Sequence, residues 1–250
     1  DVVTYVLDSG VDGSNAAEFG NRVEAGFTLY PPSAYGEPGN VDVLGHGTKV
    51  ASVLAGASAG VAKRATIVPV RILDGNGAST YEALNAALDW VMADVRTRGA
   101  ARAIINLSVD APASASATIK LKEVRAAGIL IVAAAGNRFM DACSRTPGGS
   151  GDVVSVGAVA PSANALSSGG DTTMTWFSNY GRCVTLFAPG EGVPAATSDG
   201  TAELATTSGT SMSAPNVAGV AALVWSKYPN WTANQVAARL VADAVGGAVD

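Results

Sequence analysis

The sequence has few charged residues, a single histidine, two cysteines and no long apolar run. Charged side chains make up 15% of the residues, the formal net charge is -5, and Lys and Arg are not clustered, so neither a nucleic acid nor an anionic membrane is indicated as a partner. The longest apolar stretch, Ala126–Ala135, is far shorter than the ~20 residues that span a membrane. The chain does not begin with Met, and we expect that any signal or pro-segment has been removed or omitted from the sequence.

Apolar residues and glycine are abundant instead. Hydrophobic residues make up 48% of the chain and there are 29 glycines, a composition typical of a compact interior with many tight turns. A chain of 250 residues is long enough for one sizeable core, and it shows no internal repeat, low-complexity block or linker-like run. We therefore predict a single domain over residues 1–250.

Short apolar runs predict strands. Most of these runs do not alternate with polar residues, which is typical of strands that are covered on both faces of a parallel sheet. The predicted strands are Val2–Leu7, Ile67–Ile72, Ala103–Leu107, Ile129–Ala134, Val153–Val159 and Val184–Phe187.

Stretches of helical composition lie between these runs, and the alternation predicts an α/β fold: a three-layer, doubly wound, mainly parallel sheet with helices on both faces. Val217–Trp225 is apolar all round, so we expect its helix to be packed on every side. Residues 163–175 are predicted to form an exposed loop. The predicted helices are His46–Leu54, Tyr81–Thr97, Ser116–Ala126, Ser211–Lys227 and Thr232–Ala242.

Three polar residues could together perform nucleophilic catalysis, although each also has an ordinary structural role. His46 is the only histidine, and a lone histidine is usually structural or exposed. Asp8 follows the first strand, at the sheet edge where open parallel sheets form their sites, but aspartate also forms turns. Ser211 stands at a helix start, where serine commonly caps the helix. Together they offer an orienting carboxylate, a base and a nucleophile.

The sequences around these residues resemble those of the subtilisin family of serine proteases. The matching motifs are Asp8-Ser-Gly10, Gly45-His-Gly-Thr48 and Gly209-Thr-Ser-Met-Ser-Ala-Pro215, in the family's order, together with Ala133-Ala-Ala-Gly-Asn137, Phe177-Ser-Asn-Tyr-Gly181 and Phe187-Ala-Pro-Gly190. The resemblance covers nearly the whole chain and is closest to the proteinase K and aqualysin branch. It implies a secreted serine endopeptidase with Asp8, His46 and Ser211 as its triad, Asn137 as an oxyanion donor, and an acyl-enzyme intermediate.

The same resemblance implies where a polypeptide substrate lies. An extended peptide would run along Leu107, Ser108, Val109 and Asp110, and its P1 side chain would enter a pocket walled by Ala134, Ala135 and Gly136. Small wall residues suit a roomy pocket for an apolar P1 side chain. The sequence departs from its relatives at Asp110 and Ala111, which replace two glycines. Asp110 would favour a basic substrate side chain, or else it is simply a solvated carboxylate.

Cys143 and Cys183 match a disulfide of aqualysin-like relatives, and a bond between them would indicate an oxidising compartment; buried free thiols are the alternative. One calcium site of proteinase K-like relatives uses carbonyl oxygens that align near Gly151 and Val153, and an aspartate that aligns with Thr185. Without that carboxylate we expect the site to be weak or absent, and we predict no metal or cofactor requirement for catalysis.

Two other functions remain open at this stage. A peptide ligase or macrocyclase on the same scaffold would pass the acyl group to an amine, and a catalytically silent binding module would keep the fold alone. A dinucleotide-binding protein is not indicated, because no Gly-x-Gly-x-x-Gly turn follows the first strand. We expect a monomer whose partners are polypeptide substrates and a removed pro-segment or protein inhibitors. Asn230-Trp-Thr232 is a glycosylation sequon in a predicted surface turn.

Overall fold

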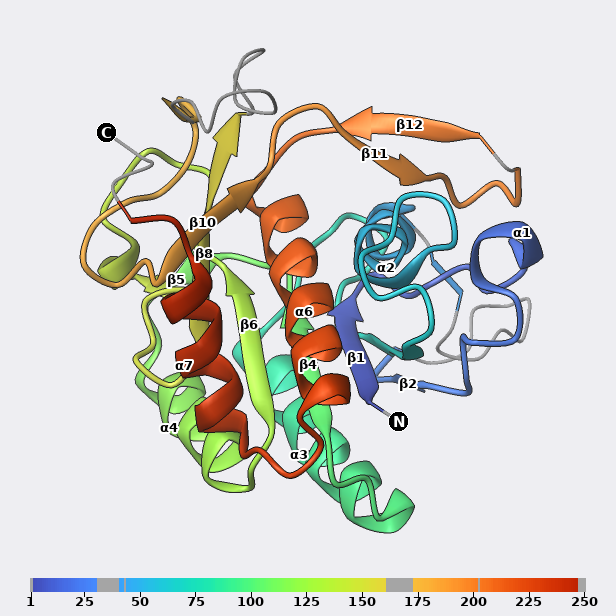
Figure 1. Ribbon diagram of the computed structural model, residues 1–250, viewed down its shortest axis with the longest axis horizontal. Helices are drawn as coiled ribbons and strands as arrows, with labels where there is room; N and C mark the ends of the chain where they lie inside the picture. Colours follow the sequence, from blue (N-terminus) through green and yellow to red (C-terminus); the bar gives the residue numbers. More distant parts are fainter. Residues whose placement is uncertain (1, 31–40, 43, 161–172, 202, 247–250) are drawn as a thin grey trace.

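A mainly parallel sheet forms the centre of the computed structural model, which describes residues 2–30, 41–42, 44–160, 173–201 and 203–246 (Figure 1). The first strand lies between the third and the fourth. The second and third strands extend the sheet on one side of it, and the chain then crosses to the other side, where the fourth strand begins the other half of the sheet. The strands, from edge to edge, are β10 (Leu186–Pro189), β8 (Val154–Ala160), β6 (Leu130–Ala134), β4 (Ala103–Leu107), β1 (Val3–Asp8), β3 (Thr66–Arg71) and β2 (Phe27–Thr28).

The inner strands are continuous apolar runs because both of their faces are covered. Every residue of β4 and of β6 is buried. Successive residues of β1 point to opposite sides, so Val6 joins one core while Tyr5 and Leu7 join the other. Two hydrophobic cores therefore lie back to back across one sheet.

Helices cover both faces, as the sequence predicted. Helices α2 (His46–Ala55), α6 (Thr210–Lys227) and α7 (Ala233–Asp243) pack on one face, while α3 (Tyr81–Arg98) and α4 (Ala115–Ala126) pack on the other (Figure 1). The molecule is thus the three-layer, doubly wound α/β structure that the alternation of runs indicated.

Local sequence explains where these helices begin and how closely they approach. The Thr80 side chain accepts a hydrogen bond from the Ala83 N–H at the start of α3, and Thr232 forms a capping box with Gln235 at the start of α7. Helix α6 crosses α2 at Gly219, where a Cβ atom would lie only 2.9 Å from the Leu54 carbonyl oxygen. Glycine is therefore required at this contact.

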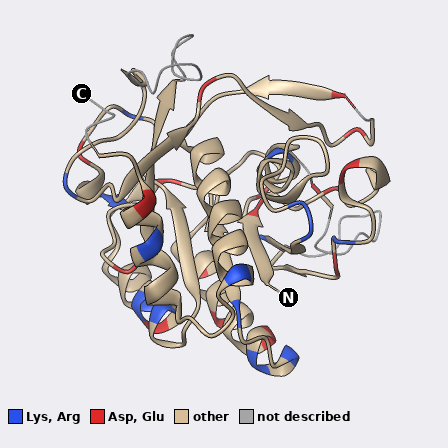
Figure 2. Cartoon of the chain, viewed as in Figure 1, with Lys and Arg blue, Asp and Glu red and all other residues tan. Residues whose placement is uncertain are grey.

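Charged side chains lie on the outer surfaces of the helices. Figure 2 shows Lys and Arg mixed with Asp and Glu on α3 and α4. Lys120 of α4, for example, forms ion pairs with Asp89 of α3 and with Glu123. No helix in the described part of the chain is long and apolar enough to cross a bilayer.

The predicted strands and helices are all present, with ends that differ by at most two residues. The expectation that α6 is packed on every side is wrong, because Val220 and Leu223 are 42% and 50% exposed. Of the predicted loop, residues 163–172 lie outside the described residues, and Thr173–Met174 form a short strand, β9, antiparallel to β8.

The sequence did not predict the short elements. These are α1 (Ala16–Phe19), the edge strand β2, the strand β9, the 3-10 turn η1 (Ala142–Ser144), the antiparallel pair β5 (Ala111–Pro112) and β7 (Arg145–Thr146), and the antiparallel pair β11 (Val193–Ala196) and β12 (Leu204–Thr207).

Candidate active site

Asp8 and His46 meet where β1 ends and α2 begins. The Asp8 side chain is fully buried, and its Oδ1 atom lies 2.7 Å from Nδ1 of His46, whose own side chain is 34% exposed. The Ser9 N–H donates to the same Oδ1 at 2.8 Å, which fixes the carboxylate. The negative charge of Asp8 raises the pKa of His46 above its ordinary value of 6.5, although burial of the ring opposes this shift.

Glycine at position 47 allows α2 to approach the end of β1. A Cβ atom there would lie 2.0 Å from the Gly10 carbonyl oxygen and 3.1 Å from Cβ of Asp8. Any larger residue would push the first turn of α2, and with it His46, away from Asp8. The glycine after the histidine is thus a geometric requirement of the pair.

Ser211 lies in the first turn of α6 and is joined to Ser108, the residue that follows β4. The Ser211 hydroxyl donates to the Ser108 carbonyl oxygen at 3.3 Å, and the Ser108 hydroxyl donates to the Ser211 carbonyl oxygen at 2.8 Å. Among the described residues, the Ser211 hydroxyl has this partner and not His46. Hydrogen bonds between a nucleophile and its base often tighten only when substrate is bound.

The Asn137 side chain is oriented by the start of the same helix. Its Oδ1 atom accepts hydrogen bonds from the backbone N–H and from the hydroxyl of Thr210, both at 2.8 Å. The amide nitrogen of Asn137 is therefore the end that remains to donate. It lies beside the N-terminus of α6, where the helix dipole favours negative charge.

Two buried asparagine side chains support these residues, although the sequence did not indicate a role for either. The Asn179 Oδ1 atom accepts from the backbone N–H groups of Arg138 and Met140, at 3.0 and 3.2 Å, and so shapes the loop that carries Asn137. Asn106 donates to the Ser108 hydroxyl at 2.9 Å. Asn179 could have been found from the sequence, because it belongs to the motif at 177–181. Asn106 could not, because it lies in a buried strand without any motif that marks it.

An open groove of about 930 Å³ runs beside His46. Of the predicted substrate residues, Ser108, Val109 and Asp110 line it. Leu107, Ala134, Ala135 and Gly136 are buried and do not line it. The rest of the lining is Leu44, Lys49, Ile72, Leu73, Gly77, Ser79, Thr80, Tyr81, Glu82, Leu84, Ala111, Pro112, Thr146 and Pro147.

Asp110 is not a solvated carboxylate, so that prediction is wrong. Its side chain is 17% exposed and its two oxygens accept from Nε and Nη2 of Arg145, at 2.8 and 2.7 Å. Arg138 lies further out, with Nε 3.4 Å from Oδ2 of Asp110. The sequence gave no sign of this pair, because Arg145 lies 35 residues away on β7.

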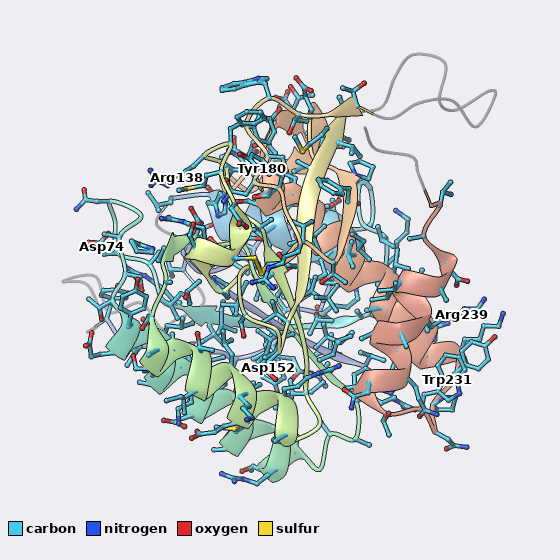
Figure 3. All side chains as sticks on the ribbon, turned by 90° about the vertical axis from the view of Figure 1, so that its left-hand side faces the viewer. Asp74, Arg138, Asp152, Tyr180, Trp231 and Arg239 are labelled. Atoms are coloured by element: carbon cyan, nitrogen blue, oxygen red, sulfur yellow. A yellow bond between two sulfur atoms is a disulfide. The ribbon has the colours of Figure 1, made fainter. Side chains whose placement is uncertain are left out.

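The predicted disulfide between Cys143 and Cys183 is present, which excludes the free-thiol alternative. The two Cα atoms are 5.2 Å apart and the cysteines are separated by 40 residues. Figure 3 shows the bond in yellow, on the side of the molecule where Arg138 and Tyr180 are labelled. The disulfide joins the loop after Asn137 to the segment after Tyr180.

Thr185, which aligns with the aspartate of the relatives' calcium site, lies next to β8. The Thr185 hydroxyl is neutral, and it already accepts a hydrogen bond from the Ser155 N–H at 3.0 Å. Elsewhere in the described ranges, no three His, Cys, Asp or Glu side chains are grouped closely enough to hold a metal ion.

Comparisons with known proteins point to a single family. The family model described as "Subtilase family" matches residues 1–250. The chain is 37% identical over 241 residues to the "Extracellular serine proteinase" of Thermus sp. (strain Rt41A), a match that covers 96% of the chain and 54% of the relative. It is 35% identical over 248 residues to the "Alkaline serine exoprotease A" of Vibrio alginolyticus, a match that covers 99% of this chain and 43% of that relative.

A solved structure, described as a "cold adapted subtilisin-like serine proteinase", superposes with a TM-score of 0.87 at 32% identity; the match covers 100% of this chain and 84% of that chain. The chain spans about half the length of the curated relatives it matches.

Proposed function

Because this chain belongs to the subtilase family, we propose that it is a serine endopeptidase, with Ser211 as nucleophile, His46 as general base and Asp8 as the orienting carboxylate. The observation that carries the proposal is the 2.7 Å contact between the buried Asp8 carboxylate and Nδ1 of His46. This contact places the proton of the neutral ring on Nδ1 and leaves Nε2 as the basic nitrogen.

The reaction proceeds in two acyl-transfer steps. Nε2 of His46 takes the hydroxyl proton while Ser211 Oγ attacks the peptide carbonyl carbon, and it then gives this proton to the leaving amine as the C–N bond breaks. Water, deprotonated by the same nitrogen, then attacks the resulting ester; the imidazolium returns this proton to Ser211 Oγ as the C–O bond breaks, which releases the acid and restores the serine hydroxyl. In each step the imidazolium that forms is stabilised by the charge of Asp8.

The oxyanion of each tetrahedral intermediate has two proposed donors. The first is the Asn137 side-chain amide, whose oxygen is held by Thr210, and the second is the Ser211 backbone N–H at the start of α6. Because both donors are held in place before reaction, little reorganisation is needed as the charge develops.

The substrate is proposed to lie extended along Ser108–Asp110, with an apolar P1 side chain next to residues 134–136. The proposed enzyme is secreted: the Thermus relative is named extracellular, and a disulfide suits an oxidising compartment. We propose a monomer that interacts with its own pro-segment or with protein inhibitors. Catalysis is proposed to need no cofactor, and calcium to bind weakly or not at all at Thr185.

The test compares hydrolysis of a denatured protein and of peptide anilides by the wild type and by Ser211→Ala, with and without phenylmethylsulfonyl fluoride. Ser226→Ala is the matched control, because Ser226 lies on the same helix and is exposed. We expect cleavage to be lost in Ser211→Ala and in the inhibited enzyme, and kept in Ser226→Ala. Cleavage that survives in a folded Ser211→Ala would refute the assignment of the nucleophile.

Mass spectrometry of the products in the presence of an added amine completes the test. Free acids as the main products support hydrolysis, whereas amides of the added amine would identify a ligase. Failure of Ser211 to react with a fluorophosphonate would identify a silent module, since that probe needs an activated nucleophile.

A further inference from the structure

The carboxyl group of Asp110 packs directly against Gly136. A Cβ atom built on Gly136 would lie 3.0 Å from Cγ and 3.0 Å from Oδ1 of Asp110, and 2.3 Å from Nδ2 of Asn179. Under the proposed function, the P1 side chain of the substrate lies between the segment that contains Asp110 and the segment that contains Gly136. The two walls of this pocket are therefore already in contact.

Burial of the inner wall leads to the same conclusion. Ala134 and Ala135 are 2% and 0% exposed, and Gly136 is buried as well. The open groove beside His46 is lined by residues 108–112 but by none of residues 134–136. A pocket that was open to a large side chain would leave its inner wall accessible from the groove.

The Asp110 side chain is fixed in this position by Arg145. Strand β7, which carries Arg145, pairs with β5, which directly follows Asp110, and the register places Arg145 opposite Pro112. Both Asp110 oxygens accept from the guanidinium of Arg145, whose side chain is only 9% exposed. A bidentate pair with little exposure holds both side chains in one geometry, because separating them would leave a poorly solvated charge.

The charge at this place is not suited to a basic substrate side chain. Arg138, which is 65% exposed, brings a second guanidinium to within 3.4 Å of the same carboxylate. Two cations therefore surround one anion, and a lysine or arginine side chain of the substrate would meet a net positive charge. Figure 3 shows Arg138 at the outer edge of this side of the molecule.

We propose that Asp110, held by Arg145, closes the P1 pocket to large and to cationic side chains, so that the enzyme selects polypeptides with glycine, alanine or serine at P1. This inference rests on the proposed function and narrows its substrate class. The small wall residues predicted a roomy P1 pocket. With Asp110 in place, the pocket is shallow instead.

The experiment measures kcat/KM for three peptide anilides that differ only at P1, which is alanine, phenylalanine or lysine. We expect the wild type to prefer alanine over phenylalanine by at least about tenfold, the lower end of what a pocket contact discriminates, and to cleave the lysine peptide least well. Removing Asp110 alone would leave Arg145 unpaired, so the informative variants also carry Arg145→Met.

A matched pair of double variants separates volume from charge. Asp110→Gly with Arg145→Met empties the space beside Gly136, and it should raise the ratio of phenylalanine to alanine cleavage by at least about tenfold. Asp110→Leu with Arg145→Met removes the same charges but keeps the volume, and it should leave that ratio low. Asp243→Gly, which breaks an exposed ion pair with Arg239, should behave as the wild type.

The inference fails if the wild type prefers phenylalanine or lysine, or if the two double variants show the same ratio. Fluorophosphonate labelling of Ser211 without cleavage of any of the three peptides also overturns it, while the proposed nucleophile stands. If Ser211 is not labelled and none of the three peptides is cleaved, the proposed function itself is overturned. Circular dichroism of every variant shows whether it is folded.

Discussion

Asp8 is fully buried and lies 2.7 Å from the ring of His46, which stays 34% exposed. One residue of this pair is thus fixed in the interior while the other faces the groove. Asp8→Asn keeps the size of the side chain but removes the charge, and its amide favours the wrong tautomer of the ring. We expect kcat to fall by about 10⁴, as in other triads. Circular dichroism with kcat on a P1 alanine anilide tests this; a loss under tenfold in a folded variant would contradict the role of Asp8.

The pH dependence of activity should report the charge state of His46. Asp8 raises the pKa of the ring above its ordinary value of 6.5. The neutral form of the ring, which is the base, therefore predominates only at a pH above this raised pKa. The value of kcat/KM should therefore rise with pH through a midpoint above 6.5. A midpoint below that value would show that another group controls the acid side of the profile.

Lys49 offers a finer test of the same ring. Its positive charge lowers the pKa of His46, and its side chain lines the groove. Lys49→Gln should move the acid midpoint to higher pH, and Lys63→Gln, an exposed lysine elsewhere, should not. A shift in the opposite direction for Lys49→Gln would refute the electrostatic account of His46.

Asn137→Ala should lower kcat and leave KM nearly unchanged, because an oxyanion donor acts mainly in the transition state. The expected loss is about 10²–10³, a magnitude taken over from subtilisin; only its direction follows from this structure. Steady-state kinetics on a single anilide would measure it. A rise in KM at constant kcat would instead mean that Asn137 binds substrate in its ground state.

The disulfide should contribute substantially to stability. A loop of 40 residues is closed by the bond, for which a chain-entropy treatment gives about 4 kcal/mol. Cys143→Ser with Cys183→Ser should lower the free energy of unfolding in urea by an amount of this order. Dithiothreitol should destabilise the wild type similarly and leave the double variant unchanged. Equal unfolding curves for the wild type and the double variant would contradict this.

Gly47→Ala should disturb the first turn of α2. The added methyl would lie 2.0 Å from the Gly10 carbonyl oxygen, so the backbone must shift at a cost of about 1–3 kcal/mol or more. Gly75→Ala is the control, since a Cβ atom there meets nothing within 4 Å. Urea unfolding of both variants provides the measurement. Equal stability would show that α2 adapts freely at this point.

Apolar runs and stretches of helical composition were enough to locate the long elements of this fold. Buried strands such as β4 and helices such as α3 are long enough to leave a clear pattern, and their ends were predicted within two residues. Two-residue strands such as β5 and β7 leave none, because pairing between distant segments creates them. Helix α6 was misjudged for a related reason: apolar composition at Val220 and Leu223 does not prevent their exposure.

The candidate site divides in the same way. Asp8, His46 and Ser211 stand in motifs of several residues and could be proposed from the sequence. The partner of Asp110 could not, since the guanidinium of Arg145 reaches it through the register of β5 and β7 rather than through any local pattern. Loop contacts of this kind decide pocket size, and short sequence motifs do not encode them.

For the proposed peptidase, the close crossing of α2 and α6 at Gly219 bears on how one molecule could digest another. His46 begins α2 and Ser211 lies in the first turn of α6, so the proposed base and nucleophile are held together only while the two helices stay packed. A molecule must separate α2 from α6 before its chain can be cleaved at this crossing. The same separation moves His46 away from Ser211, so that molecule can no longer cleave itself. Self-digestion at this place must then occur between an intact molecule and an opened one, and its rate should grow with the square of the protein concentration.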